Sequence, residues 1–148
     1  MSYWDTSALV KLYASESDSA AFENYAADTP GPIIVSTIGL YEARATFIRK
    51  EIDGALQPNA ASVLYSKLAQ DVTSGQVLVI ALSTDIEREY GQVLDLCYRN
   101  PNPGPIPLRT LDALHLASCR VAGETEIVAT DKRLRDAARQ LNLSLFPT

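Results

Sequence analysis

The sequence predicts an α/β protein: a three-layer α/β/α sandwich with a central, mainly parallel sheet of four or five strands. Short, continuous and partly β-branched apolar runs are typical of strands covered on both faces. Longer segments between them have the apolar spacing of amphipathic helices. Strands separated by helices pair in parallel through right-handed crossovers, which places helices on both faces of the sheet.

The expected elements follow from these two patterns in chain order. Strands are expected at residues 3–4, 33–35, 77–80 and 127–129, and residues 143–146 would add a fifth. A helical run covers residues 8–13, another helix begins near Thr110, and a last one covers residues 132–141. Three longer helices have apolar stripes, which comprise Ile38, Tyr41, Ala45, Ile48 and Ile52; Ala61, Leu64, Tyr65, Leu68 and Val72; and Ile86, Tyr90, Val93, Leu94 and Cys97.

Length and composition are those of an ordinary folded core. With 148 residues, of which 47% are apolar and 21% charged, we expect one domain over residues 1–148. The longest apolar run, residues 77–82, is far shorter than the roughly 20 residues of a membrane span. The first residues have neither the basic nor the apolar region of a secretory leader, and Cys97 and Cys119 are too few for a disulfide framework. We therefore expect a cytoplasmic protein without a leader and without membrane contact.

One segment is unusual, because four of the eight prolines fall within residues 101–107. Prolines at this density favour a stiff, extended connector between two helices. A rigid rim of the functional site, or a contact with a partner, is the alternative interpretation.

Several kinds of chemistry lack their motifs. The sequence contains no G-x-G-x-x-G, G-x-x-x-x-G-K-[ST] or G-x-S-x-G, which argues against dinucleotide, P-loop and serine-hydrolase sites. His115 is the only histidine, so a pair of catalytic histidines is excluded, and its spacing from the cysteines does not fit a zinc site. Acid chemistry therefore has to come from carboxylates.

Four carboxylates are placed where they could act together. Asp5 and Asp131 each follow a predicted strand and precede a helix, although each could simply cap that helix. Glu42 lies too deep in its helix to cap it and could instead be a solvated flank. Asp112 falls in a first helical turn, where an acid favours the helix dipole, but its neighbours are apolar. Parallel strands deliver such residues to one edge of the sheet.

Four carboxylates in one partly buried cleft would repel one another, and burial would add a desolvation cost. A divalent cation resolves this conflict. Mg²⁺ and Mn²⁺ prefer oxygen ligands and are typically held by one or two carboxylates together with substrate phosphate oxygens. Such ions polarise a phosphoryl group and make hydroxide available near neutral pH. The carboxylates therefore point to hydrolysis of a phosphodiester.

The residues around these acids resemble the motifs of the PIN-domain ribonucleases, in particular the VapC-type toxins of toxin–antitoxin pairs. The resemblance runs in order through DTSALVKLY at 5–13, YEAR at 41–44, LDALHLA at 111–117 and ATDKRL at 129–134. It covers essentially the whole chain. The last motif departs from that of many relatives, in which the Asp stands one residue further from the Thr. Whether Thr130 or Asp131 reaches a metal therefore stays open.

The resemblance implies an endoribonuclease that depends on Mg²⁺ or Mn²⁺. Its metal-binding and catalytic residues would be Asp5, Glu42, Asp112 and Asp131. Ser7 and Thr130 would hydrogen-bond to ligands or phosphate around them. The resemblance further implies an RNA substrate, a small antitoxin that covers the acidic cleft, and a homodimer. His115 would be a core residue or a supporting residue beside the acids.

The net charge of −5, from 18 acidic and 13 basic side chains, argues at first against an RNA partner. Setting the four acids aside leaves 14 against 13, so the acidity is concentrated at the expected site. Arg44 and Arg109 are the residues we expect to bind substrate phosphate. Two alternatives remain: a catalytically silent PIN-like protein- or RNA-binding module, and phosphoryl transfer through an aspartyl-phosphate on Asp5. The latter lacks an Asp at position 7, which is Ser7.

Overall fold

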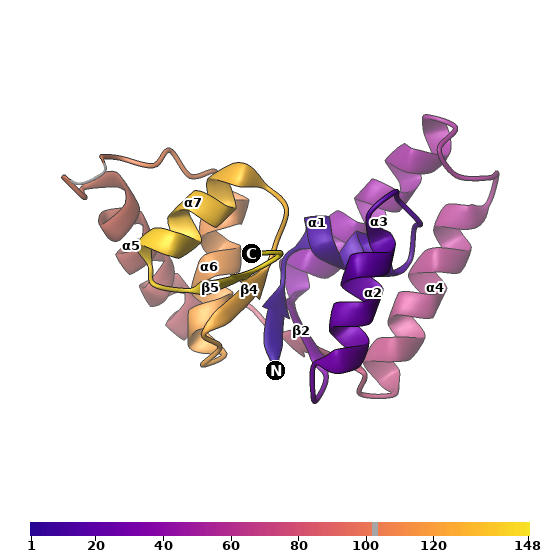
Figure 1. The fold of residues 1–148 in the computed structure, drawn as a ribbon, viewed down its shortest axis with the longest axis horizontal. Coiled ribbons are helices and arrows are strands. Elements are labelled where there is room, and N and C mark those ends of the chain that lie inside the picture. The colour runs from indigo at the N-terminus through magenta and orange to yellow at the C-terminus, as the bar shows by residue number, and fades with distance from the viewer. Residues whose placement is uncertain (102–103) are drawn as a thin grey trace.

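A computed structural model of the chain describes residues 1–101 and 104–148. All five strands pair in parallel in one sheet of order β3-β2-β1-β4-β5, so the first strand of the chain lies at the centre (Figure 1). The predicted parallel sandwich is confirmed, and each strand agrees with its prediction to within one residue at either end. The strands are β1 (Ser2–Trp4), β2 (Ile33–Ser36), β3 (Val77–Ile80), β4 (Glu126–Val128) and β5 (Ser144–Phe146).

Helices cover both faces of the sheet. Figure 1 shows α5, α6 and α7 on one side of the strands and α2, α3 and α4 on the other. Their bounds are α1 (Thr6–Leu9), followed by the 3-10 turn η1 (Val10–Leu12), α2 (Ser19–Asp28), α3 (Thr37–Ile52), α4 (Ala60–Thr73), α5 (Thr84–Tyr98), α6 (Thr110–Val121) and α7 (Lys132–Gln140).

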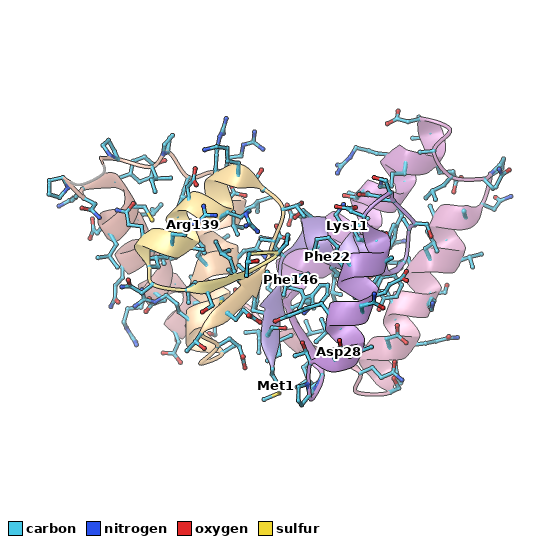
Figure 2. The ribbon with its side chains drawn as sticks, in the orientation of Figure 1. Met1, Lys11, Phe22, Asp28, Arg139 and Phe146 are labelled. Carbon is cyan, nitrogen blue, oxygen red and sulfur yellow. The ribbon has the colours of Figure 1, made fainter. Side chains whose placement is uncertain are left out.

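The buried core is divided by the sheet into two clusters. Successive strand residues point to opposite faces. In β1, Tyr3 joins the cluster beneath α5, α6 and α7, whereas Trp4 joins the cluster beneath α1 to α4. On this second face Phe22 of α2 lies against Phe146 of β5, with ring centroids 5.5 Å apart in a T-shaped arrangement (Figure 2). Each helical layer is thereby anchored to the central strands.

Two helical segments near the start of the chain differ from expectation. The run at residues 8–13 is not one helix but the short α1 and the turn η1. The helix α2 was not predicted, because its sequence is mostly small and polar and buries only Ser19 and Phe22. A single buried aromatic provides too little periodicity for a helix to be recognised.

The predicted apolar stripe of α3 was wrong in most of its members. Tyr41, Ile48 and Ile52 are 67%, 47% and 78% exposed. The helix instead buries Ala43 and Phe47 against the cluster beneath α1 to α4. These two residues are four apart, so they share one helical face, and that face is the one that packs against the core.

The remaining expectations concern the edges of the sheet, the connectors and the cysteines. The prediction that every strand is covered on both faces is wrong for β3. This strand lies at the edge of the sheet, and its Leu78 is 43% exposed. The described part of the proline segment is neither helix nor strand, and the prediction for Asn102 and Pro103 lies outside the described residues. Both cysteines are buried and unpaired, as expected. Among the described helices, none has the length and apolarity to span a membrane.

Candidate active site

The four predicted acids, Asp5, Glu42, Asp112 and Asp131, line one cavity of about 360 Å³ and are called the acid cluster below. They come from four different elements. Asp5 directly follows β1, Asp131 begins α7 after β4, Glu42 lies on α3 after β2, and Asp112 lies in the first turn of α6. The cavity is also lined by hydroxyl, basic and other side chains, namely Thr6, Ser7, Val10, Lys11, Glu16, Thr46, Arg49, Arg109, His115 and Thr130.

Asp5 is the most deeply buried of these acids, with 5% of its surface exposed. It caps α1, since its Oδ1 accepts a hydrogen bond from the backbone N–H of Ala8 at 3.0 Å. The Ser7 hydroxyl also donates to Oδ1, at 2.7 Å. Burial nevertheless raises the pKa of Asp5 to about 6, and the nearby carboxylate of Glu42 adds to this effect. Asp5 therefore caps α1 as predicted, but the hydrogen bonds of the cap do not offset the cost of burying its negative charge.

Glu42 is held by two hydrogen bonds that converge on one oxygen. The Thr6 hydroxyl donates to Oε2 at 2.6 Å, and His115 Nε2 lies 2.7 Å from the same atom. Burial raises the pKa of Glu42, but the hydrogen bonds from His115 and Thr6, and behind them the charge of Arg49, outweigh it and hold the pKa below its usual value. Glu42 therefore differs from Asp5 in staying readily ionised.

His115 is itself fixed from behind. It is 2% exposed, and its Nδ1 lies 2.8 Å from the hydroxyl of Tyr3. Burial raises the pKa of Tyr3 and keeps its hydroxyl protonated. In the tautomer that carries its proton on Nε2, His115 donates a hydrogen bond to Glu42 and accepts one from the Tyr3 hydroxyl at Nδ1. The predicted core or supporting residue is thus the middle of a chain of hydrogen bonds from β1 to the acid cluster.

Asp112 and Asp131 form the other side of the acid cluster. Burial raises the pKa of Asp112, and the nearby charge of Asp131 raises it further. The Oδ2 atom of Asp112 is buried and has no hydrogen-bond partner among the described residues. Asp131 caps α7, since its Oδ1 accepts from the backbone N–H groups of Arg133 and Leu134 at 2.9 and 3.1 Å. An unpartnered buried carboxylate oxygen calls for a ligand.

Ser7 and Thr130 join the two strand ends that carry Asp5 and Asp131. The Ser7 hydroxyl donates to Asp5 and accepts from the backbone N–H of Thr130 at 3.0 Å. Thr130 is exposed and lines the cavity. The structure thus places Ser7 as the link between the two strand ends and Thr130 at the mouth of the cavity.

The basic residues of the cavity are only partly those expected. Arg109 precedes α6 and lines the cavity near Asp112. Arg44 does not reach the cavity, because two helical residues beyond Glu42 it points in nearly the opposite direction. Its guanidinium lies over the ring of Tyr65, 4.9 Å from the centroid, in a separate hollow. Arg49 takes its place in the cavity.

A compensated group of charges adjoins the acid cluster and is called the ion-pair cluster: Lys11, Glu16, Asp18 and Lys50. The buried Lys11 pairs with Glu16 and, at 2.7 Å, with Asp18. Lys50 pairs with the other oxygen of Glu16 at 2.7 Å. Lys11 and Glu16 line the cavity, but their charges are already balanced there.

The acid cluster fits a divalent cation, although not as a closed cage. Within residues 1–101 and 104–148, no three His, Cys, Asp or Glu side chains are grouped closely enough to hold one metal ion. Mg²⁺ needs no such group, because it keeps several waters and takes one or two carboxylates together with phosphate oxygens. A bound cation would give the unpartnered oxygen of Asp112 a partner and would lower the raised pKa values of Asp5 and Asp112.

The residues of the cavity that the sequence analysis does not single out include Thr6, Thr46 and Arg49. Thr46 and Arg49 could have been found, because they lie four and seven residues after Glu42 and therefore on its helical face. The hydrogen bond between Thr6 and Glu42 joins residues 36 apart, and no local pattern indicates it.

Comparison with known proteins agrees with this geometry. The sequence profile of the PIN domain matches residues 2–140. Ribonuclease VapC46 of Mycobacterium tuberculosis is 32% identical over 146 residues, which cover 97% of this chain and 95% of that protein.

Solved structures share the fold. VapC20 of M. tuberculosis, a toxin that cleaves the sarcin–ricin loop, has a TM-score of 0.68 at 21% identity and covers 93% of this chain and 95% of its own. FitAcB of Neisseria gonorrhoeae has a TM-score of 0.66 at 16% identity, over 99% and 96% of the two chains. VapBC2 of Rickettsia felis, bound to a promoter DNA fragment, has a TM-score of 0.62 at 18% identity, over 98% and 97%.

Proposed function

Because this chain belongs to the PIN domain family, we propose that it is an endoribonuclease that hydrolyses RNA phosphodiester bonds as the toxin of a toxin–antitoxin pair. One observation carries the proposal. The buried Asp5 and the half-buried Asp112 line the same cavity, both with raised pKa values, and Asp112 presents an unpartnered oxygen. The relative VapC46, which aligns over nearly the whole chain, is a ribonuclease by name.

The proposed cofactor is Mg²⁺ or Mn²⁺, since both are hard cations that suit carboxylate and phosphate oxygens. Asp5 and Asp112 would hold it, with Glu42 and Asp131 as further oxygen ligands or as ligands of its waters. When bound, such an ion polarises the phosphoryl group and makes hydroxide available near neutral pH.

The protein's own groups would orient the reactants. Glu42 is the acid whose pKa is held low, so its carboxylate can accept a hydrogen bond from the attacking water. His115 and Thr6 both hydrogen-bond to Oε2 of Glu42. No side chain in the described part of the protein is seen to hydrogen-bond to Oε1, which leaves that atom for the water. Ser7 and Ala8 hold Asp5 in one orientation at the end of β1. Preorganisation of this kind avoids reorganising the acids during the reaction.

Substrate contacts would come from the rim of the cavity. Arg109 is exposed beside Asp112, and no carboxylate pairs with it in the described part of the chain. Its guanidinium is suited to a phosphate on the Asp112 side. Thr130, at the mouth, would add a hydroxyl contact. Arg44 is no longer a candidate, because it lies in another hollow.

The proposed partners are an RNA substrate, a small antitoxin and a second copy of the chain. An antitoxin that inserts an Arg or Lys into the cavity would supply the positive charge that the acid cluster lacks. We place the activity in the cytoplasm, where RNA substrates are found.

The test is cleavage by protein purified free of any partner. Structured and single-stranded RNA are incubated with EDTA, Mg²⁺ or Mn²⁺, beside Asp5→Asn and Asp112→Asn. Cleavage that needs the metal and fails in both variants is expected. Metal-independent cleavage, or full activity in both variants, would refute the carboxylate mechanism. RNA binding without cleavage under any condition would favour a silent binding module.

A further inference from the structure

The helix α3 presents a second polar pair to the cavity beyond Glu42. Thr46 and Arg49 both line the cavity, and Arg49 Nη2 donates a hydrogen bond to the Thr46 hydroxyl at 2.8 Å. At 1.5 Å per residue, Arg49 lies roughly 10 Å along the helix from Glu42. A hydroxyl and a guanidinium thus continue the row that the acid begins.

Arg49 is the cation on this side that forms no ion pair with a described carboxylate, although its charge helps to lower the pKa of Glu42. Lys11 and Lys50 both belong to the ion-pair cluster, where Glu16 balances them. No carboxylate pairs with Arg49 among residues 1–101 and 104–148; its contact there is the neutral hydroxyl of Thr46. An oriented guanidinium at the wall of a polar cavity is suited to a phosphate, which it can bind through two parallel hydrogen bonds.

We propose that Arg49, oriented by Thr46, binds a backbone phosphate of the RNA that neighbours the scissile phosphate. This subsite rests on the proposed function and adds to it the direction of the strand, which runs from the acid cluster along α3. A reach of roughly 10 Å along α3 corresponds to one or a few nucleotides of the strand, so the bound phosphate lies close to the scissile one.

Arg44 provides the matched control. It lies on the same helix, has the same charge and is also unpaired with any described carboxylate, but its guanidinium covers Tyr65 outside the cavity. If Arg49 acts only through the overall charge of the protein, Arg44→Gln and Arg49→Gln will have equal effects. If it binds a phosphate, only Arg49→Gln will affect the substrate.

The experiment uses the full chain and a single-stranded oligoribonucleotide that the unaltered protein cleaves at one mapped bond. Arg49→Gln should raise KM at least about tenfold, the value of one charge-assisted hydrogen bond, with kcat within about twofold. Arg44→Gln should leave both within about twofold. Thr46→Val should raise KM less than Arg49→Gln does, and should add nothing in the Arg49→Gln background.

Neutral methylphosphonate groups, placed one at a time beside the cleaved bond, locate the contact. One position should raise KM for the unaltered protein and for Arg44→Gln, but not for Arg49→Gln. The subsite is overturned if both Arg variants have the same KM. It is also overturned if every neutral position raises KM for Arg49→Gln as much as for the unaltered protein. Absence of cleavage by the unaltered protein in Mg²⁺ and Mn²⁺ would instead overturn the proposed function itself.

Discussion

The acid cluster and the ion-pair cluster adjoin the same cavity, and burial acts on both, yet their charges are balanced in opposite ways. In the ion-pair cluster, burial raises the pKa of Glu16, but hydrogen bonds from Lys11 and Lys50 hold it below its usual value. In the acid cluster, burial raises the pKa of Asp5 and of Asp112, and other carboxylates raise them further. Lys11, labelled in Figure 2, lies in η1, and its partners Glu16 and Asp18 lie in the segment that leads into α2.

This difference separates charges that serve the fold from charges that serve a ligand. The ion-pair cluster contains its own counter-charges, so it is complete in the folded chain. The acid cluster contains no ion pair with a Lys or Arg among the described residues, so the cation proposed above would supply its missing counter-charge. A buried charge that the fold itself does not balance is therefore the better indicator of a functional site.

The largest expected effect separates the two clusters by activity. Asp112→Asn removes a charge that the proposed cation needs, and it should lower kcat/KM for RNA cleavage by at least about 100-fold. Asp18→Asn makes the same chemical change in the ion-pair cluster and should stay within about twofold. Equal losses in the two variants would show that the clusters do not differ in function.

The next effect separates them by the pH dependence of stability. Without metal, the unfolded chain releases the Asp5 proton near its ordinary pKa of 3.8, and the folded chain releases it at about 6. The folded chain thus binds more protons in this window, and its stability falls as pH rises. Ionisation of Asp5 alone should lower the free energy of unfolding by about 2 kcal/mol as the pH rises from about 4.5 to about 7.5.

The measurement is urea unfolding in EDTA, with the Asp5→Asn chain as the reference. The difference in unfolding free energy between the two chains should shift by that amount over the window, in favour of Asp5→Asn at the higher pH. Added Mg²⁺ should restore stability to the unaltered chain only. A pH-independent difference would mean that Asp5 is not destabilised by its surroundings.

Replacing Lys11 of the ion-pair cluster should lower the stability of the fold, whereas replacing Asp5 should raise it at neutral pH. Lys11→Met leaves Glu16 and Asp18 without their shared partner and should destabilise the fold by about 1–2 kcal/mol, less than a fully buried pair because both acids are partly exposed. Urea unfolding at neutral pH measures it. A Lys11→Met chain as stable as the unaltered one would contradict a structural role for this cluster.

The smallest effect concerns the chain of hydrogen bonds behind Glu42. Tyr3→Phe leaves Nδ1 of His115 without its partner and loosens the orientation of the ring. Mn²⁺ affinity, measured by titration calorimetry, should fall about threefold, less than for a residue that contacts a metal-binding group directly. Tyr13→Phe removes a hydroxyl bound to Asp71, away from the acid cluster, and should not change it.

Much of this arrangement could be predicted from local sequence, because strand ends and helix starts are local features. Asp5, Asp112 and Asp131 lie at such positions, and parallel strands bring them to one edge. The direction of a helical side chain is also a local feature, and it puts Arg49 on the face of Glu42 but Arg44 on nearly the opposite face. The buried face of α3 is not a local feature, because the neighbouring elements decide which face of a helix is covered.

Contacts between distant residues could not be predicted in this way. His115 and Glu42 are 73 residues apart, and nothing in either motif indicates a shared hydrogen bond. The same holds for Tyr3 and His115, 112 residues apart. Such pairs depend on the packing of α3, α6 and β1 as a whole, which periodicity and capping signals do not encode.

The central position of β1 has a consequence for the order in which the protein is made. The first strand of the chain pairs with β4, and the backbone N–H of Asp5 donates to the carbonyl of Val128 at 3.0 Å. A growing chain therefore cannot assemble its acid cluster until residues 126–131 have left the ribosome. The proposed cleavage site is therefore among the last parts of the fold to be completed, because it needs residues from both ends of the 148-residue chain.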